Sequence, residues 1–205
     1  MKPIDKFIEY AKKETKEAGV KLHLSKVKYL RISEESYLKC DGWFDSEEKI
    51  LKCAINRPVK KWLMSFVHEF SHFQQWKNNS KAWRETSIGK IDAHSEFFEW
   101  INGKKISSKK LEIYCQKALN VELECEKMAV KNIRKFDLPI DVEEYIQKAN
   151  AYIWLYKWIL IRRAKWPSIS PSIIPQITSK MPKRFKRQYH TISEEYLKLY
   201  DKYCI

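Results

Sequence analysis

Apolar residues recur at helical spacing through most of the chain, and a shorter alternating stretch follows the first helical segment. Four apolar positions in the first eleven residues predict a helix over 4–18, with Gly19 as its stop. Further helices are predicted by the same spacing, by Pro58 at a favoured first-turn position and by Ser or Asp caps. They cover residues 58–78, 92–103, 107–135, 142–166 and a last short segment from 193.

The remaining segments alternate or are rich in turn residues. Residues 21–33 predict a strand, and residues 36–56 predict two short strands around the polar turn 45–49. Residues 78–90 resemble a loop, and 167–182, with four prolines, predict an irregular crossing segment. The order of helix, small sheet and further helices predicts an α+β fold that is mainly helical.

A single principal domain is expected over residues 1–140, with 141–205 as a helical, basic extension packed on it. At 205 residues and 44% hydrophobic composition the chain can bury a substantial core, and only four Gly argue for long helices. No stretch reaches the roughly 18 uncharged apolar residues of a membrane span. The charged N-terminus is unlike a secretory signal, and five cysteines without CxxC spacing favour a reducing compartment. The expected location is the cytoplasm, or the host cytoplasm for a viral protein.

Positive charge is concentrated near the C-terminus, within a net charge of +14. Between Glu144 and Glu194 there is no acidic residue, while ten basic residues occur: Lys148, Lys157, Arg162, Arg163, Lys165, Lys180, Lys183, Arg184, Lys186 and Arg187. The tract over 157–187 predicts a surface for nucleic acid or an acidic partner, or a solvated face that keeps the protein dissolved. The aromatic helix within it indicates a central packing helix, because both its faces are apolar.

The stretch VHEFSH, residues 67–72, holds two of the five histidines. On a helix His68 and His72 share one face, so both imidazoles can bind a single Zn²⁺ at about 2.0–2.1 Å. Glu69 lies about 100° around the helix, where it can take a proton from a zinc-activated water without binding the metal. This H-E-x-x-H pattern predicts a zinc metallopeptidase that hydrolyses a peptide or protein substrate, with the strand 50–56 as the edge that holds it. The alternative, a core helix with a chance pattern, would bury two imidazoles and a carboxylate at a cost.

A catalytic zinc commonly has a third protein ligand. A histidine six residues after His72 would supply it in one group of proteases, but that position is Asn78. Two candidates stay open: His94, and Glu122 on the helix 107–135. Glu126 shares a helix face with Glu122, so one carboxylate can bind zinc while the other holds the second ring nitrogen of a ligand histidine.

HEFSH followed by the helical ELECEKMA, residues 122–129, resembles the gluzincin metallopeptidases, most of all the ImmA/IrrE-type and phage-encoded ones. The resemblance covers residues 49–136 and implies a zincin-like domain in which Glu122 is the zinc ligand. Cys125 matches a small residue of the family pattern, and Glu126 stands at an Asp or Asn position as a longer side chain.

A second, weaker resemblance concerns His94. HSEFFEW, residues 94–100, is similar to the His-Gly-x-x-Phe segment of SprT-like proteases, with Ser95 in place of the glycine. If His94 were the third ligand, the resemblance would imply a protease of protein–DNA adducts, which would use the basic tract.

Peptide hydrolysis also needs a donor for the developing oxyanion. Gluzincins commonly use a Tyr or His from later in the chain, and Tyr189 and His190 are the candidates, unless both face solvent in the basic tract. Three hypotheses remain: a zinc endopeptidase, which leads; a zinc-site protein that acts by binding nucleic acid or a regulator; and a membrane-peripheral or structural protein.

Overall fold

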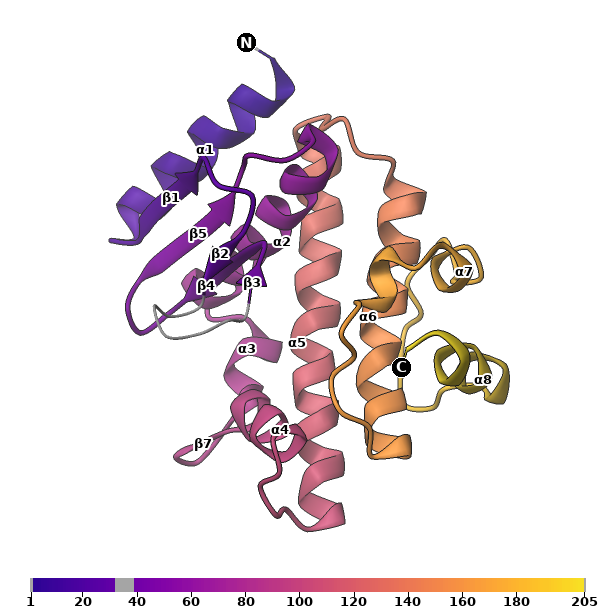
Figure 1. The fold of residues 1–205 in the computed structure, drawn as a ribbon. Helices are drawn as coiled ribbons and strands as arrows, with labels where there is room; N and C mark the ends of the chain where they lie inside the picture. Colours follow the sequence, from indigo (N-terminus) through magenta and orange to yellow (C-terminus); the bar gives the residue numbers. More distant parts are fainter. Residues whose placement is uncertain (1, 32–38, 205) are drawn as a thin grey trace. The chain divides into compact units, whose positions relative to one another are not determined.

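The computed structural model describes residues 2–31 and 39–204, and most of them are helical, with three small sheets. The expected α+β class with dominant helix is confirmed. The chain divides into two compact units, whose helices and strands carry their labels in Figure 1. Unit 1 comprises Met1–Ser80 and Met128–Ile140, and unit 2 comprises Lys81–Lys127 and Asp141–Ile205. Residues 81–127, expected in the first domain, belong to unit 2, and the division into domains 1–140 and 141–205 stays a prediction.

Unit 1 combines short strands with two complete helices and the end of a third. Its elements are α1 (Pro3–Glu17), β1 (Lys21–Ser25), β2 (Leu30–Arg31), β3 (Lys39–Cys40), β4 (Gly42–Asp45), β5 (Ile50–Ala54), α2 (Val59–Lys77) and the last turns of α5 (Ser108–Lys135). The predicted helices 4–18 and 58–78 are confirmed. The helix α1 stops as expected, with Gly19 at a left-handed φ of 71°.

The main sheet of unit 1 has the strand order β1-β5-β4. β1 runs parallel to β5 and β4 runs antiparallel to it, with Gly42 opposite Cys53. β5 therefore has a partner on both sides, and the expectation that residues 50–56 form the edge is wrong: among the described residues β4 is an edge strand. The strand expected over 21–33 is broken into β1 and β2, and the parts of the predicted strands within 32–38 lie outside the described residues.

Aromatic side chains form the core between α1 and α2. The ring of Phe7 lies 5.2 Å from that of Phe66, 5.4 Å from Phe70 and 5.3 Å from Phe136, measured between centroids. The last turns of α5 are also bonded to α2, since Asn132 Nδ2 donates to Gln74 Oε1 at 2.8 Å. Unit 1 is thus closed by residues that follow the first part of unit 2 in the sequence.

Unit 2 is almost entirely helical. Its elements are α3 (Lys81–Thr86), β6 (Ser87–Ile88), β7 (Ile91–Asp92), α4 (Ala93–Ile101), the first part of α5, α6 (Val142–Arg162), η1 (Pro171–Ile173), α7 (Pro175–Thr178) and α8 (Glu194–Tyr203). The loop expected over 78–90 is wrong, because α3 and the first strand of a small hairpin lie there. A six-residue helix is too short to show a helical period in the sequence.

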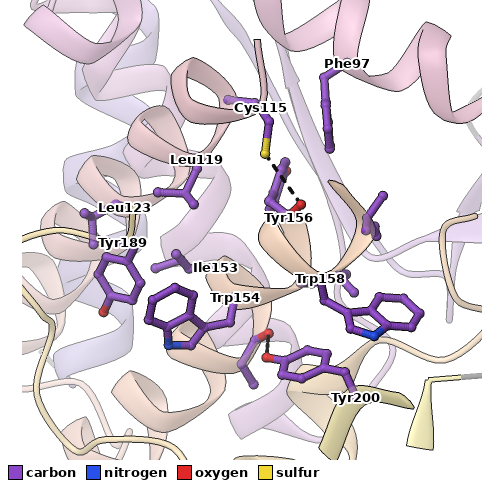
Figure 2. Close-up of a cluster of buried hydrophobic side chains, with 14 of the residues drawn as sticks. Phe97, Cys115, Leu119, Leu123, Ile153, Trp154, Tyr156, Trp158, Tyr189 and Tyr200 are labelled. Carbon is purple, nitrogen blue, oxygen red and sulfur yellow. Dashed lines mark hydrogen bonds between the residues drawn. The ribbon is translucent and has the colours of Figure 1, made fainter. Parts of the chain in front are cut away.

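The helix α6 forms the centre of unit 2 (Figure 2), which confirms its interpretation as a packing helix. Trp154, Tyr156 and Ile159 are buried, and Tyr156 stacks on Phe97 of α4 with centroids 5.6 Å apart. α6 ends four residues before the predicted end at 166, because Arg163 adopts a left-handed φ of 51°. Among the described helices, none combines the length and apolar character needed to span a membrane.

The hydroxyl of Tyr200 ties α8 to α6 inside this core, donating to Ala151 O at 2.6 Å. We expect Tyr200→Phe to lower the free energy of unfolding by about 1 kcal/mol, because a buried hydrogen bond is lost while the ring still fills its place. Urea titration followed by circular dichroism measures the change. Tyr203→Phe, a half-buried tyrosine on the same helix, is the control and should change stability by less than about 0.5 kcal/mol. Equal effects of the two substitutions would contradict the role given to this bond.

Candidate metal centre

The two faces of α2 differ in chemistry. Phe66, Phe70 and Phe73 are fully buried on its apolar side. His68, Glu69 and His72 are all half-buried, so each combines access to solvent with a partly dry surrounding. The structure therefore brings the three residues of the H-E-x-x-H motif onto one accessible helix, as the sequence predicts.

The two histidines lie close together. Their ring centroids are 4.7 Å apart, with the ring planes at 88°. His72 Nδ1 lies 2.9 Å from Oε1 of the buried Gln75. An amide oxygen accepts a hydrogen bond, so this contact favours the tautomer with hydrogen on Nδ1 and leaves the Nε2 lone pair for a metal. The imidazoles of unit 1 thus fit two positions of a zinc site.

Gln75 is a site residue that the sequence interpretation missed. It stands three residues after His72 on α2, so the two side chains are neighbours on the helix surface. The spacing of three residues between His72 and a glutamine is the signal in the sequence that indicates this contact.

Glu69 lies against the edge strand β4. A Cβ atom added to Gly42 would be 3.0 Å from Glu69 Cγ and 2.9 Å from the carbonyl oxygen of Lys52. The absence of a side chain at residue 42 therefore lets the carboxylate approach the strand closely. In unit 1 the carboxylate of the motif is thus placed beside an edge that could accept an extended peptide.

The negative charge of Glu69 acts on the pKa of two nearby cysteines, Cys40 and Cys53. Burial, and then the negative charges of Glu69 and Asp41, raise the pKa of Cys40 to about 11. Burial first, and then Glu69, also raise the pKa of Cys53 far above its usual value. Both thiols therefore stay protonated near neutral pH, which makes them poor nucleophiles and poor metal ligands as they stand.

Unit 2 brings the two alternative third ligands together. Glu122, on α5, is buried, and His94 Nε2 on α4 lies 3.6 Å from its Oε1. Tyr156 OH, on α6, donates to the same oxygen at 3.4 Å. Burial, followed by the charge of Glu122, raises the pKa of Tyr156 well above its usual value, so the tyrosine remains a donor. The two candidates are neighbours, which their separation in the sequence does not reveal.

Glu126 has a similar environment one turn along α5. It is buried and accepts a hydrogen bond of 2.6 Å from Tyr145 OH of α6. α6 therefore supplies a tyrosine hydroxyl to each member of the glutamate pair. Neither tyrosine was singled out from the sequence, because the pairing of α6 with α5 sets these contacts.

Tyr189 and His190 occupy different surroundings in unit 2. Tyr189 is buried against Trp154, its hydroxyl donates to Asn150 Oδ1, and it accepts from Lys186 N at 3.1 Å. His190 is exposed, with Nδ1 3.3 Å from Gln116 Oε1. Tyr189 would have to leave its core contacts to donate a hydrogen bond to an oxyanion. His190 is already exposed at the surface, so the same role would not require it to leave the core.

Several charges of the basic tract are balanced within unit 2. Arg162 forms an ion pair with Asp201 at 2.7 Å, and Lys183 one with Glu143 at 2.8 Å. Lys157 is buried and donates to Gln116 Oε1 at 2.7 Å. The surplus of basic over acidic residues is shared equally by the two units. The tract is therefore a less concentrated source of positive potential than its sequence indicates.

No family model matches the chain, and no curated protein or solved structure matches it either. The resemblance to metallopeptidases therefore stays an expectation that rests on the motif residues of the sequence.

The contact between His72 and Gln75 gives a prediction for metal binding. We expect Gln75→Met to weaken zinc binding about 10–100-fold, because the ring loses the acceptor that fixes its tautomer and direction. Competition with a chelating dye measures the affinity. Gln75→Glu keeps an acceptor at the same place and should retain most of it. If Gln75→Met binds zinc as tightly as the unmodified protein, the hydrogen bond does not orient a ligand.

Proposed function

We propose that this protein is a zinc-dependent metallopeptidase. The observation that carries the proposal is the arrangement on α2, where His68 and His72 lie side by side, Gln75 fixes the ring of His72, and Glu69 borders the edge strand. Two imidazole nitrogens beside a carboxylate form the donor set typical of catalytic zinc.

The residues of unit 1 would divide the work. Zinc, when bound, acts as a Lewis acid that lowers the pKa of a coordinated water toward about 7. Glu69 is the general base: its carboxylate accepts the proton of the attacking water and can return it to the leaving amine. His68 and His72 hold the metal. Because Glu69 is half-buried, its carboxylate meets a less polar surrounding than bulk water, which strengthens its interactions with charge.

An extended substrate would lie along β4. The outer side of an edge strand carries backbone N–H and C=O groups that can pair with an added strand. Gly42, on this strand, lies against the side chain of Glu69, so a peptide paired with β4 would pass close to the general base. This replaces β5, the central strand, in the role expected from the sequence.

Glu122 is proposed as the third ligand, on the strength of its resemblance to the gluzincin pattern and of its buried position on α5. Its Oε1 accepts from Tyr156, which would orient the carboxylate. Cys125 lies three residues further along the same helix and is buried. Because a thiolate is also a common zinc ligand, Cys125 is a second candidate for the third ligand on this helix.

His94 carries the second candidate function. It lies 3.6 Å from Glu122, so the SprT-like ligand set of three histidines remains a specific alternative. In that case the basic residues of unit 2 would contact nucleic acid.

Glu69→Gln tests the proposed function most directly. The amide keeps the size of the side chain but cannot accept the proton, so we expect peptide cleavage to disappear while bound zinc stays nearly equimolar. Cleavage of an unstructured protein substrate and metal analysis by mass spectrometry measure the two quantities. Glu48→Gln, an exposed glutamate of unit 1, is the control and should keep both. Loss of most of the zinc from Glu69→Gln would make Glu69 a ligand and overturn the assignment.

The third ligand is tested by comparing zinc affinity across four variants. We expect Glu122→Ala to lose zinc by a large factor and His94→Ala to stay near the unmodified protein, because Glu122 is fixed on the longer helix. Glu126→Ala should lose about 10–100-fold, as expected for a residue that holds a ligand in place. Zinc lost from His94→Ala but retained in Glu122→Ala would favour the SprT-like alternative, and zinc lost mainly from Cys125→Ser would make the thiolate the ligand.

A further inference from the structure

Unit 2 contains a pocket where α4 ends, α5 begins and α6 ends. Figure 1 shows the start of α5 and the end of α6 at the same end of this unit, and Arg163 Nη2 donates to Ser108 Oγ at 3.3 Å across them. The pocket is shallow and open to solvent, with a volume of about 500 Å³. Its lining includes Trp100, Lys104, Lys105, Ile106, Ser107 and Arg163, none of which belongs to the proposed metal centre.

The cations around the pocket are not equally engaged. Lys104 forms an ion pair of 2.6 Å with Glu96 of α4, which balances its charge. Lys105 and Arg163, by contrast, have no carboxylate within ion-pair distance in the part of the chain that the structure describes. Two cationic side chains at a concave surface raise the local concentration of anions.

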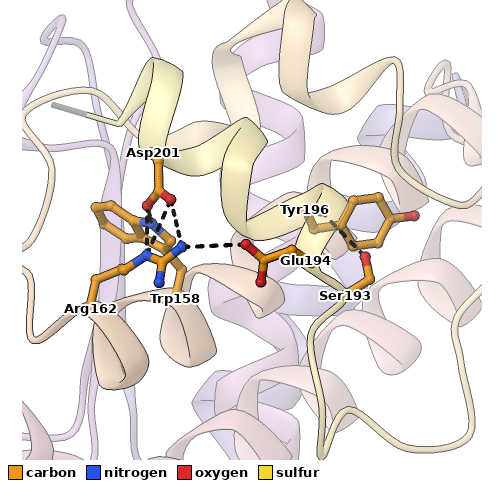
Figure 3. A network of polar contacts seen from close by, with 6 residues as sticks. All are labelled: Trp158, Arg162, Ser193, Glu194, Tyr196 and Asp201. Atoms are coloured by element: carbon orange, nitrogen blue, oxygen red, sulfur yellow. Dashed lines mark hydrogen bonds and ion pairs between the residues drawn. The ribbon is translucent and has the colours of Figure 1, made fainter.

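The neighbouring residue, Arg162, has its positive charge balanced by a carboxylate of the same unit. Arg162 donates from Nε and Nη2 to the two carboxylate oxygens of Asp201, at 2.9 and 2.7 Å, and Trp158 Nε1 donates to the same carboxylate (Figure 3). Arg162 is thus committed to joining α6 to α8. Arg163, one residue later, lines the pocket instead.

The backbone of Arg163 is left-handed, with φ 51°. This conformation follows the end of α6 and is the one that glycine adopts with least strain, because a Cβ atom crowds the backbone there. The backbone conformation at this position therefore does not require an arginine, because glycine would adopt it with less strain. Its guanidinium, with five N–H donors in a planar fork, is suited to a phosphate group.

The lining of the pocket also includes two apolar side chains, Trp100 and Ile106. Trp100 is half-buried and packs on Phe97 with centroids 5.7 Å apart, and Ile106 is also half-buried. An indole ring held in place by packing offers a flat surface on which another planar ring can stack. The pocket thus combines a flat apolar surface, the hydroxyl of Ser107 and two cations.

We propose that this pocket binds a mononucleotide, whose phosphate contacts Lys105 and Arg163 and whose base stacks on Trp100. The ligand class follows from the two kinds of lining side chain, since a phosphate alone would not use the indole and an aromatic ring alone would not use the cations. The site is independent of the proposed metallopeptidase activity.

Calorimetric titration of the full chain with adenosine monophosphate, adenosine and inorganic phosphate tests the ligand class. We expect the nucleotide to bind at least tenfold more tightly than either part, and more weakly as salt rises. Equal affinity for phosphate and nucleotide would reduce the pocket to a simple anion site, and equal affinity for adenosine and nucleotide would remove the phosphate contact. Either result overturns the proposal, as does the absence of binding.

Arg163→Gly separates binding from folding. Glycine relieves the left-handed backbone, so thermal stability should be unchanged or higher, while nucleotide affinity should fall about tenfold or more because a charged hydrogen-bond donor is lost. Lys165→Gln removes an exposed cation that does not line the pocket, and should leave affinity unchanged. Unaltered affinity in Arg163→Gly, or an equal loss in Lys165→Gln, would overturn the proposed contact.

Discussion

The burial of one aromatic face of α2 is the constraint on which unit 1 depends. Phe66 and Phe70 are removed from water against Phe7, and each buried ring contributes about 1.5–3 kcal/mol relative to exposure. Once this face is buried, the rotation of the helix is fixed, and the direction of every other side chain follows. The motif residues do not hold α2 in place; the aromatic packing holds it, and the polar positions take their directions from that packing.

A comparable relation exists in unit 2 between packing and polar groups. Apolar residues bury α6 at the centre, yet the same helix donates tyrosine hydroxyls to Glu122 and Glu126. A buried carboxylate is costly unless it accepts hydrogen bonds, and each of these two has at least one donor that is itself fixed in the core. The tyrosine hydroxyls therefore reduce the free-energy cost of burying two glutamates inside a helical unit. They also restrict the directions of both carboxylates.

Much of the helical framework could be predicted from the sequence, because its signals are local. The period of apolar residues gives α1, α2, α5 and α6, and the caps at Asp141 and Ser193 place two of the starts. The spacing of His68 and His72 likewise needs nothing beyond the geometry of one helix. These features depend on residues a few positions apart, which is the range over which a sequence pattern carries direct information.

The remaining features depend on contacts between distant segments. β5 is central only because β1, which three short strands (β2, β3 and β4) separate from it in the sequence, pairs parallel to it. The proximity of His94 to Glu122 requires α4 to fold back on α5, and the burial of Tyr189 requires a pairing with Asn150 of α6. Local patterns do not encode such pairings. The sequence could therefore indicate these residues as candidates, but not which residues they contact.

The order in which unit 1 is assembled follows from the path of α5. Phe136 and Asn132, which contact Phe7 and Gln74, follow the whole of Lys81–Lys127 in the chain. A nascent polypeptide leaving the ribosome therefore presents α1 and α2 before their last packing partners have been translated. Until then the aromatic surface of Phe7 and Tyr10 that Phe136 covers stays open to water, and in this interval the growing chain is most exposed to aggregation and to capture by chaperones.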